Sequence, residues 1–312
     1  MLAMGMLLAG PSLAQSYPTK VVRMLVGFSP GGGVDFMART VSPRLAEALG
    51  QQFVVDNRSG ANGMIAAELA AKAVPDGHTL LLAPGNYAFA QAMGQSAFDM
   101  TTAFAAVVQL VDSPLLVVVH PSVPAKDLAG LVRLGRSKPG QLTYGSGGTG
   151  GAGHLATELF KSVARVDFLH VPYKGVGPAL TDLVAGHVST CFCTLPTTLP
   201  HARSGRLRAL AVTTAKRTAA APEIPTVAEA GVAGYEMSQW YGVLAPAGTS
   251  SAVLERLSTE INRTLAAPDM KSRLLATGAD PVVSSPALFS AFFKAEIVKW
   301  TRIVKAAGVK GE

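Results

Sequence analysis

The sequence predicts an α/β protein of two lobes, each built on a central, mostly parallel sheet flanked by helices. Short apolar runs alternate with helical patterns along most of the 312 residues, and a repeated β-α-β order implies parallel strands. A chain of this length rarely forms a single core, so we expect two domains. The 49% of hydrophobic and 15% of charged residues are typical of a well-buried globular protein.

The first lobe follows from the periodicity of apolar residues. Residues 21–28 (VVRMLVGF) are typical of a buried strand, and apolar residues then recur every four positions along a helix that ends at Gly50. The predicted elements are strands over 21–28, 53–57 and 78–83 and helices over 36–50 and 63–74. This β-α-β-α-β unit accounts for the first third of the chain.

A second α/β unit begins with the apolar run 115–122. Its predicted elements are strands over 115–122, 142–146, 167–173, 188–194 and 207–214 and helices over 128–137, 154–163 and 177–187. Two further helices, 251–266 and 287–306, follow a short apolar stretch that is too small for a sheet of its own. We therefore expect this C-terminal part to pack on the first unit, with the chain crossing between lobes near 115–120 and 238–243.

These crossings divide the chain into residues 16–117 with 241–312 in the first lobe, and residues 118–240 in the second lobe. Residues 1–15 are predicted to be a signal peptide, because an apolar stretch (MLAMGMLLAG) precedes the small-x-small pattern Ser12-Leu13-Ala14. Later apolar runs are too short or too interrupted to span a bilayer. The mature protein is therefore expected to be soluble and exported.

Charge and cysteine content argue against nucleic-acid binding and against a metal site. The net charge is +7, but Lys and Arg are scattered and no basic run is interleaved with aromatic residues, so nucleic-acid binding is not expected. Cys191 and Cys193 stand at strand spacing, which puts both on one face but leaves little chain for an unstrained disulfide. We predict two buried free thiols, and no metal site, because no other ligands lie at suitable spacing.

Two glycine-rich segments are candidates for anion binding. FSPGGGVD (28–35) and SGGTGGAGH (146–154) each lead from a strand into a helix, where unpaired N–H groups and the helix dipole favour an anion. The first segment lacks the Lys and Ser/Thr of a phosphate-binding P-loop, and a structural tight turn explains it equally well. Asp35 either compensates the helix dipole or anchors a ligand.

Further polar residues stand where predicted strands end. Ser146 and Thr149 offer hydroxyl groups beside the second glycine segment, while His154 is more typical of a structural hydrogen bond than of a catalyst. Trp240 and Tyr241 begin the return crossing, where they would brace a hinge or line the cleft. We find no motif for an activated nucleophile and therefore predict no catalytic residue.

The motifs taken together form a recognisable ordered set. YPTKVVRMLVGFSPGGGVDFMAR, PGQLTYGSGGTGGAGHLATELFK, HVPYKGVGPALTDLVAGHV, PTVAEAGVAGYE and YGVLAPAGT occur in this order. The set resembles the Bug family, the extracytoplasmic solute-binding receptors of tripartite tricarboxylate transporters. The resemblance implies a two-domain type II periplasmic binding protein, or Venus flytrap, that hands a small carboxylate to a membrane permease. It implies no cofactor, and we expect a monomer.

The resemblance also implies which residues bind the carboxylate. The residues at the matching positions are Phe28, Gly32, Gly33, Asp35, Pro84, Gly85, Asn86, Ser146, Gly147, Thr149, Gly150, His154, Tyr173, Lys174 and Thr194. Many relatives carry Asp-Asn where this chain has Cys193 and Thr194, which favours a plain carboxylate over an amino acid as ligand. Two alternatives remain: a receptor that presents its ligand to a membrane sensor kinase, and a periplasmic enzyme on the same fold.

Overall fold

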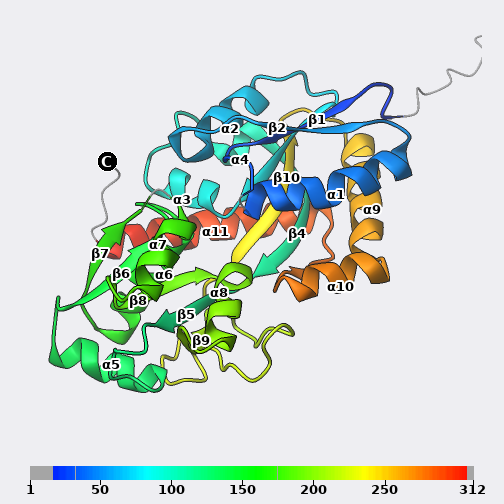
Figure 1. The fold of residues 1–312 in the computed structure, drawn as a ribbon. Helices are drawn as coiled ribbons and strands as arrows, with labels where there is room; N and C mark the ends of the chain where they lie inside the picture. The colour runs from blue at the N-terminus through cyan, green and yellow to red at the C-terminus, as the bar shows by residue number, and fades with distance from the viewer. Residues whose placement is uncertain (1–16, 32, 174, 308–312) are drawn as a thin grey trace, which may run out of the picture.

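The computed structural model describes residues 17–31, 33–173 and 175–307, which form two sheets with helices packed on both faces of each (Figure 1). The predicted signal peptide lies outside the described residues. The strands of the first sheet, in spatial order, are β11 (Asp280–Pro281), β4 (Phe104–Ser113), β10 (Gln239–Pro246), β3 (Thr79–Pro84), β1 (Val22–Val26) and β2 (Phe53–Asn57). Those of the second are β7 (Phe168–Pro172), β6 (Leu142–Ser146), β8 (Thr190–Thr194), β5 (Leu115–Val119) and β9 (Arg208–Val212).

Both sheets are mixed, which confirms the α/β class but corrects the expectation of mostly parallel sheets. Strands β1, β2 and β3 pair in parallel, and so do β6, β7 and β8. Strand β10 is antiparallel to β3 and β4, and β5 is antiparallel to β8 and β9. Strands β5 and β10, by which the chain passes from one sheet to the other, are among these antiparallel strands. Parallel pairing needs a crossover connection, usually a helix, and these passages have no such helix.

The side chains along β1 point alternately to the two faces of the first sheet, and both faces are buried. Met24 and Val26 pack on one face with α1 (Gly33–Leu49) and α9 (Ser251–Ala266), whereas Leu25 packs on the other face. That second face is covered by α2 (Met64–Ala71), α3 (Asn86–Ala92) and α11 (Pro286–Ala307). A strand buried on both sides reads as a near-continuous apolar run, which fits Val22, Met24, Leu25 and Val26 of β1, with Arg23 the exception.

The chain passes between the sheets at Pro114 and again at Ser238. Strand β4 belongs to the first sheet and β5 to the second, with only Pro114 between them. The expected lobe boundary after residue 117 therefore falls inside β5, which pairs only with strands of the second sheet. Strand β10 returns to the first sheet at Gln239, and α9 and α11 pack beside β4. In Figure 1, β10 (yellow) lies in the sheet of the N-terminal strands.

The remaining helices cover the second sheet or connect elements of the first. They are α5 (Leu128–Ser137), α6 (Ala152–Ala164), α7 (Val176–Val184) and α8 (Leu195–Arg203) around the second sheet, with α4 (Met100–Ala103) and α10 (Pro268–Ala276) beside the first. Among the described residues, no helix combines the length and the hydropathy that a bilayer crossing requires.

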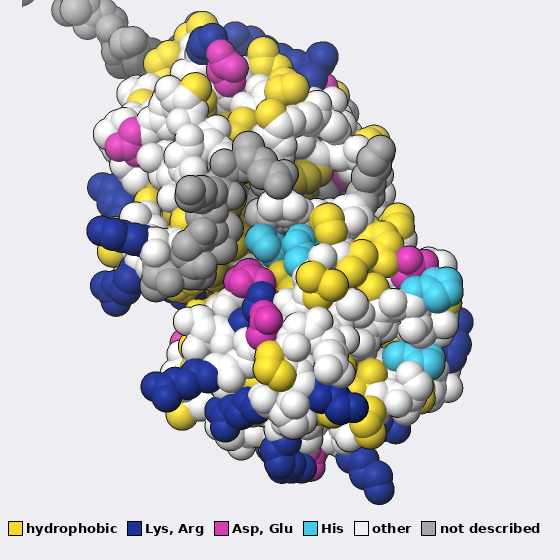
Figure 2. Space-filling view, turned by 90° about the vertical axis from the view of Figure 1, so that its left-hand side faces the viewer, with side chains coloured by type: hydrophobic (Ala, Val, Ile, Leu, Met, Phe, Trp, Pro, Cys, Tyr) yellow, Lys and Arg dark blue, Asp and Glu magenta, His cyan; other side chains and the backbone are white. Residues whose placement is uncertain are grey.

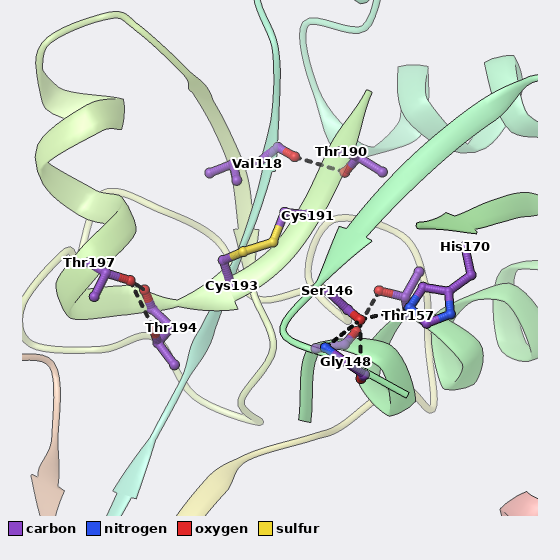
Figure 3. The surroundings of a disulfide bond; sticks show 11 residues. Val118, Ser146, Gly148, Thr157, His170, Thr190, Cys191, Cys193, Thr194 and Thr197 are labelled. Carbon is purple, nitrogen blue, oxygen red and sulfur yellow. Dashed lines mark hydrogen bonds between the residues drawn. A yellow bond between two sulfur atoms is a disulfide. The ribbon is translucent and has the colours of Figure 1, made fainter. Parts of the chain in front are cut away.

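The structure corrects the prediction that Cys191 and Cys193 are free thiols, because it joins them by a disulfide (Figure 3). Both residues point to the same face of β8, and their Cα atoms lie 5.4 Å apart, which is within the range of disulfides. Their predicted burial is confirmed, since the two side chains are 0% and 2% exposed. The two-residue spacing on β8 therefore does not prevent the bond.

Candidate functional site

A pocket of about 510 Å³ lies between the two sheets and is lined by both glycine-rich segments. From the first-sheet side it is lined by Phe28, Ser29, Ser59, Asn62, Asn86, Gln239 and Tyr241, among others. From the second-sheet side it is lined by Gly147, Gly148, Thr149, Gly153, Val176, Phe192 and Thr194, among others. The described lining residues include no Asp, Glu, Lys, Arg or His.

Several helices start at this pocket without a side-chain cap. The N-cap residues of α2, α3, α6, α7 and α8 make no side-chain capping hydrogen bond. By contrast, Asp99, Asp127 and Ser250 cap α4, α5 and α9 away from the pocket. The first N–H groups of a helix have no partner within it, and the dipole makes that end positive. The pocket therefore offers an anion several N–H donors, and no charged side chain stands among its described lining residues.

Glycine lets the backbone elements of the pocket approach closely. A Cβ on Gly27 would lie 2.6 Å from Gly63 Cα, and a Cβ on Gly153 would lie 2.7 Å from the Phe192 carbonyl oxygen. Contacts this short are not tolerated by real Cβ atoms, so the β1–α1 loop and the start of α6 both require glycine here. Gly27, just before the first segment, and Gly153, within the second, thus have a packing reason that does not depend on a ligand.

Asp35 stabilises the β1–α1 loop by hydrogen bonds, without lining the pocket itself. One carboxylate oxygen accepts the backbone N–H of Gly31 at 2.9 Å and the other accepts Asn57 Nδ2 at 3.0 Å, while Arg39 Nε lies 3.0 Å from both oxygens. Asp35 is only 3% exposed and does not line the pocket. Burial acts to raise the pKa of Asp35, but the hydrogen bonds from Arg39, Gly31 and Asn57 outweigh it and lower that pKa.

Two histidines that do not line the pocket form hydrogen bonds to the second glycine segment. Gly150 N–H donates to His154 Nδ1 at 3.1 Å, and Ser146 Oγ lies 2.7 Å from His170 Nε2 (Figure 3 shows the Ser146–His170 contact). Ser146 is 1% exposed and its hydroxyl also contacts Gly148. A Ser–His contact suggests a nucleophile and its base, but this hydroxyl is buried behind the loop and does not line the pocket.

The predicted site residues divide into four groups. Those that line the pocket are Phe28, Asn86, Gly147, Thr149 and Thr194. Those that surround the pocket without lining it are Asp35, Pro84, Gly85, Ser146, Gly150, His154 and Tyr173. Gly32 and Lys174 lie outside the described residues, and Gly33 lines a neighbouring chamber. Tyr173 is turned toward α7, where its hydroxyl donates to Asp182 Oδ2 at 2.6 Å.

The neighbouring chamber has a volume of about 250 Å³ and shares Thr194 and Tyr241 with the main pocket. Phe36 and Met37 contribute apolar surface to it, and Thr194 forms a 2.8 Å hydroxyl contact with Thr197 at its wall (Figure 3). Tyr241 thus lines the cleft, whereas Trp240 is fully buried and donates to Glu296. Of the two roles that the sequence left open for Trp240 and Tyr241, lining the cleft applies to Tyr241 and not to Trp240.

Several lining residues were missed by the sequence analysis. Asn62 follows the polar run Asn57–Gly60 and adopts a left-handed conformation with φ 54°, a geometry in which Asn is common. That run of small and polar residues was a usable signal. Gln239 and Phe192 carried none, because they lie within apolar strand patterns and reach the pocket only through the sheet topology.

Comparison with known proteins places the chain in a family. Residues 37–309 match the model described as "Tripartite tricarboxylate transporter family receptor". The chain belongs to this receptor family. It is 35% identical to protein BugT of Bordetella pertussis over 306 residues, which is 97% of this chain and 94% of BugT. The resemblance to the Bug family is therefore confirmed.

Solved structures of receptors of this type match along nearly the whole chain. The structure of R. palustris Rpa4515 with adipate is 38% identical, has a TM-score of 0.84, and the match covers 94% of this chain and 99% of that one. MatC from Rhodopseudomonas palustris with bound malate is 30% identical, with a TM-score of 0.81 and coverage of 92% and 100%. The periplasmic binding protein fold predicted from the sequence is thereby confirmed.

Proposed function

We propose that this protein is a periplasmic receptor that captures a small carboxylate in the pocket between its sheets and delivers it to the permease of a tripartite tricarboxylate transporter. One observation carries the proposal: uncapped helix starts, α6 and α7 foremost, meet at a pocket whose described lining has no charged side chain. Membership of the receptor family, and the adipate and malate bound by related receptors, agree with it.

The neutral lining suits capture followed by release. Backbone N–H groups and the hydroxyls of Ser29, Ser59 and Thr149 can each donate to a carboxylate oxygen. Bonds from charged donors are roughly twice as strong as those from neutral ones, so a guanidinium in the pocket would hold the anion more firmly. A receptor must give up its ligand to the permease, which neutral donors permit.

The same lining argues against an amino acid as the ligand. A buried ammonium group needs an anionic partner, and the described lining includes no carboxylate. Cys193, at the position where many relatives have Asp, is 2% exposed and bonded to Cys191. We therefore infer that the ligand is a carboxylate without an amino group, with an uncharged chain beside Phe28, Phe192 and Tyr241.

A thermal-shift screen of purified protein followed by calorimetry tests the capture step. The screen compares adipate, malate, succinate and citrate with aspartate and glutamate at pH 7.5, since a ligand of the folded state raises its apparent stability by RT ln(1 + [L]/Kd). We expect a carboxylate without an amino group to give the largest shift. Tight binding of aspartate or glutamate alone would overturn the choice of ligand, and no shift from any of these acids would overturn carboxylate capture.

Delivery is tested separately, by uptake of the labelled acid into vesicles that contain a tripartite permease. We expect uptake only when the receptor is present outside, and none with a receptor variant that has lost affinity in calorimetry. Ligand-dependent activation of a membrane kinase without any uptake would instead support the sensory alternative.

A further inference from the structure

We propose that His154 and His170 are positioning residues that hold the glycine loop 147–151 in its ligand-binding shape, and that His154 does so only while its imidazole is uncharged. The effect on affinity rests on the function proposed above, whereas the effect on the loop itself does not. Neither side chain lines the pocket. Both act through backbone and hydroxyl groups that border it.

The hydrogen bonds make one nitrogen of His154 an acceptor and connect His170 to the loop through Ser146. Gly150 N–H donates to His154 Nδ1 at 3.1 Å, so that nitrogen must carry a lone pair and no proton. His170 Nε2 lies 2.7 Å from Ser146 Oγ, and this hydroxyl contacts both the N–H and the carbonyl of Gly148 at 3.2 Å. The two histidines thereby secure the loop at Gly148 and at Gly150.

The two rings are also stacked on each other. Their centroids lie 4.3 Å apart with an interplanar angle of 20°, and the ring of Tyr144 stacks on His170 at 4.7 Å. Two imidazolium cations at this distance would repel strongly. In Figure 2, histidine side chains lie near the junction of the upper and lower parts of the molecule.

The groups around the pair favour the uncharged forms. Burial lowers the pKa of His170 to about 4, with His154 and Lys161 adding to the effect and Glu158 opposing it. Burial also lowers the pKa of His154, with Lys161 adding and Glu158 opposing. Glu158 is largely engaged by Tyr144 at 2.6 Å and Lys161 at 2.9 Å. Helix α11, which packs against α6, places Lys294, Lys299 and Arg302 at the groove beside Leu159, where Glu236 supplies an opposite charge, and none of these four acts on the pKa of either histidine as strongly as Glu158 and Lys161 do.

Acid therefore acts on the loop in a defined way. A proton on His154 Nδ1 turns the acceptor of Gly150 N–H into a second donor, so that hydrogen bond is lost. Gly150 has φ 75°, and a Cβ there would lie 3.5 Å from Asn62 Nδ2 of the opposite lobe. Release of Gly150 would consequently loosen the loop where the two lobes meet across the pocket.

Two substitutions of His154 separate positioning from simple packing. Asn in place of His puts an amide oxygen near the position of Nδ1, where it accepts from Gly150 at every pH. Leu fills similar space without an acceptor. Adipate is titrated calorimetrically into the wild type, His154→Asn and His154→Leu from pH 7.5 to 4.5. The exchange rate of the Gly150 amide is measured by NMR in the same proteins without ligand.

We expect His154→Leu to weaken adipate binding about tenfold at pH 7.5, as for one lost hydrogen bond, and His154→Asn to restore most of it. The ratio of wild-type to His154→Asn affinity, in which the titration of adipate itself cancels, should fall toward the acidic end of this range, because burial lowers the pKa of His154 below its ordinary value of 6.5. Protection of the Gly150 amide should be lost in His154→Leu and, on acidification, in the wild type only.

A ratio that stays constant from pH 7.5 to 4.5, or equal Gly150 protection in all three proteins, would overturn the proposal. If adipate fails to bind the wild type, that result counts against the proposed function for this acid, and the Gly150 exchange rates still decide the positioning role. If His154→Leu does not fold, the comparison of the wild type with His154→Asn decides it alone.

Discussion

The carboxylate of Asp35 accepts the backbone N–H of Gly31 at 2.9 Å, so the first turn of α1 holds the loop that leads into it. The other oxygen binds Asn57 Nδ2, and that amide also donates to the Phe28 carbonyl at 3.0 Å. Strand β2 and helix α1 are thereby tied to both ends of the loop. Because Phe28, Ser29 and Pro30 line the pocket, a change at Asp35 should reach the ligand without touching it.

Replacement Asp35→Ala should destabilise the protein by about 2–4 kcal/mol, because it leaves several donors without their buried acceptor. It should also weaken ligand binding, since the loop 28–31 loses its anchor. Urea unfolding and calorimetry measure the two effects. The control is Asp269→Ala, which removes an exposed pair with Arg44 and should cost no more than about 1 kcal/mol. Equal effects of the two substitutions would contradict the role given to Asp35.

Replacement Gly153→Ala tests the close approach of α6 to β8. The added Cβ would lie 2.7 Å from the backbone oxygen of Phe192, so helix and strand must separate. We expect a loss of about 1–3 kcal/mol of stability and weaker binding, because both residues line the pocket. Gly177→Ala is the matched control on α7, where a Cβ would meet nothing within 4 Å. That control should be neutral or stabilising by less than about 1 kcal/mol.

Much of the fold was predictable from local patterns. Helices α5 and α9 begin and end where periodicity placed them, at Leu128–Ser137 and Ser251–Ala266, and β6 matches its prediction at both ends. Strand β4 was missed because Phe104–Ser113 is interrupted by polar Gln109 and Asp112, which face α11 and the crossing rather than breaking the strand. Strand direction could not be read either, since it depends on which sheet the chain enters after Pro114 and Ser238.

The pocket was predictable only in part, for a related reason. Gly147 and Thr149 line it as expected, because a glycine-rich turn before a helix exposes its own backbone. Ser146 and His154 belong to the same segment but face inward, toward His170 on the neighbouring strand. Which residues of a loop face the ligand is decided by partners far along the chain, and a local pattern does not contain them.

Two replacements at Asn62 separate its backbone geometry from its side chain. Asn62→Gly keeps the left-handed conformation of φ 54° and removes only the amide that lines the pocket. We expect weaker ligand binding with little change in stability. Asn62→Val should in addition lose about 1–2 kcal/mol of stability, because a β-branched residue disfavours this conformation. Unchanged binding in Asn62→Gly would exclude the amide as a ligand contact.

The last prediction concerns Asp112, which lies where β4 meets the start of β10. Burial raises the pKa of Asp112 to about 6, with the negative charges of Glu296 and Asp280 adding to the effect, while hydrogen bonds from Ser238 and Gln109 oppose it. Between the unfolded value of 3.8 and about 6, the folded state therefore holds more protons than the unfolded state. The contribution of Asp112 to stability falls as pH rises through this window and stays unfavourable above it. Both hydrogen bonds go to Oδ1, at 2.8 Å from Gln109 and 3.3 Å from Ser238, so an amide can keep them.

Asp112→Asn should accordingly stabilise the protein by about 1–2 kcal/mol at pH 7.5, and by much less at pH 4, where the wild-type carboxyl is largely protonated in the folded state. Urea unfolding at both pH values measures this difference. Asp76→Asn should act in the opposite direction, because hydrogen bonds from His78 and Lys20 outweigh burial and lower the pKa of Asp76. Its carboxylate therefore stabilises the fold at pH 7.5, and that contribution is lost in acid. Destabilisation by Asp112→Asn at pH 7.5 that disappears at pH 4 would show that the negative charge at this crossing is favourable.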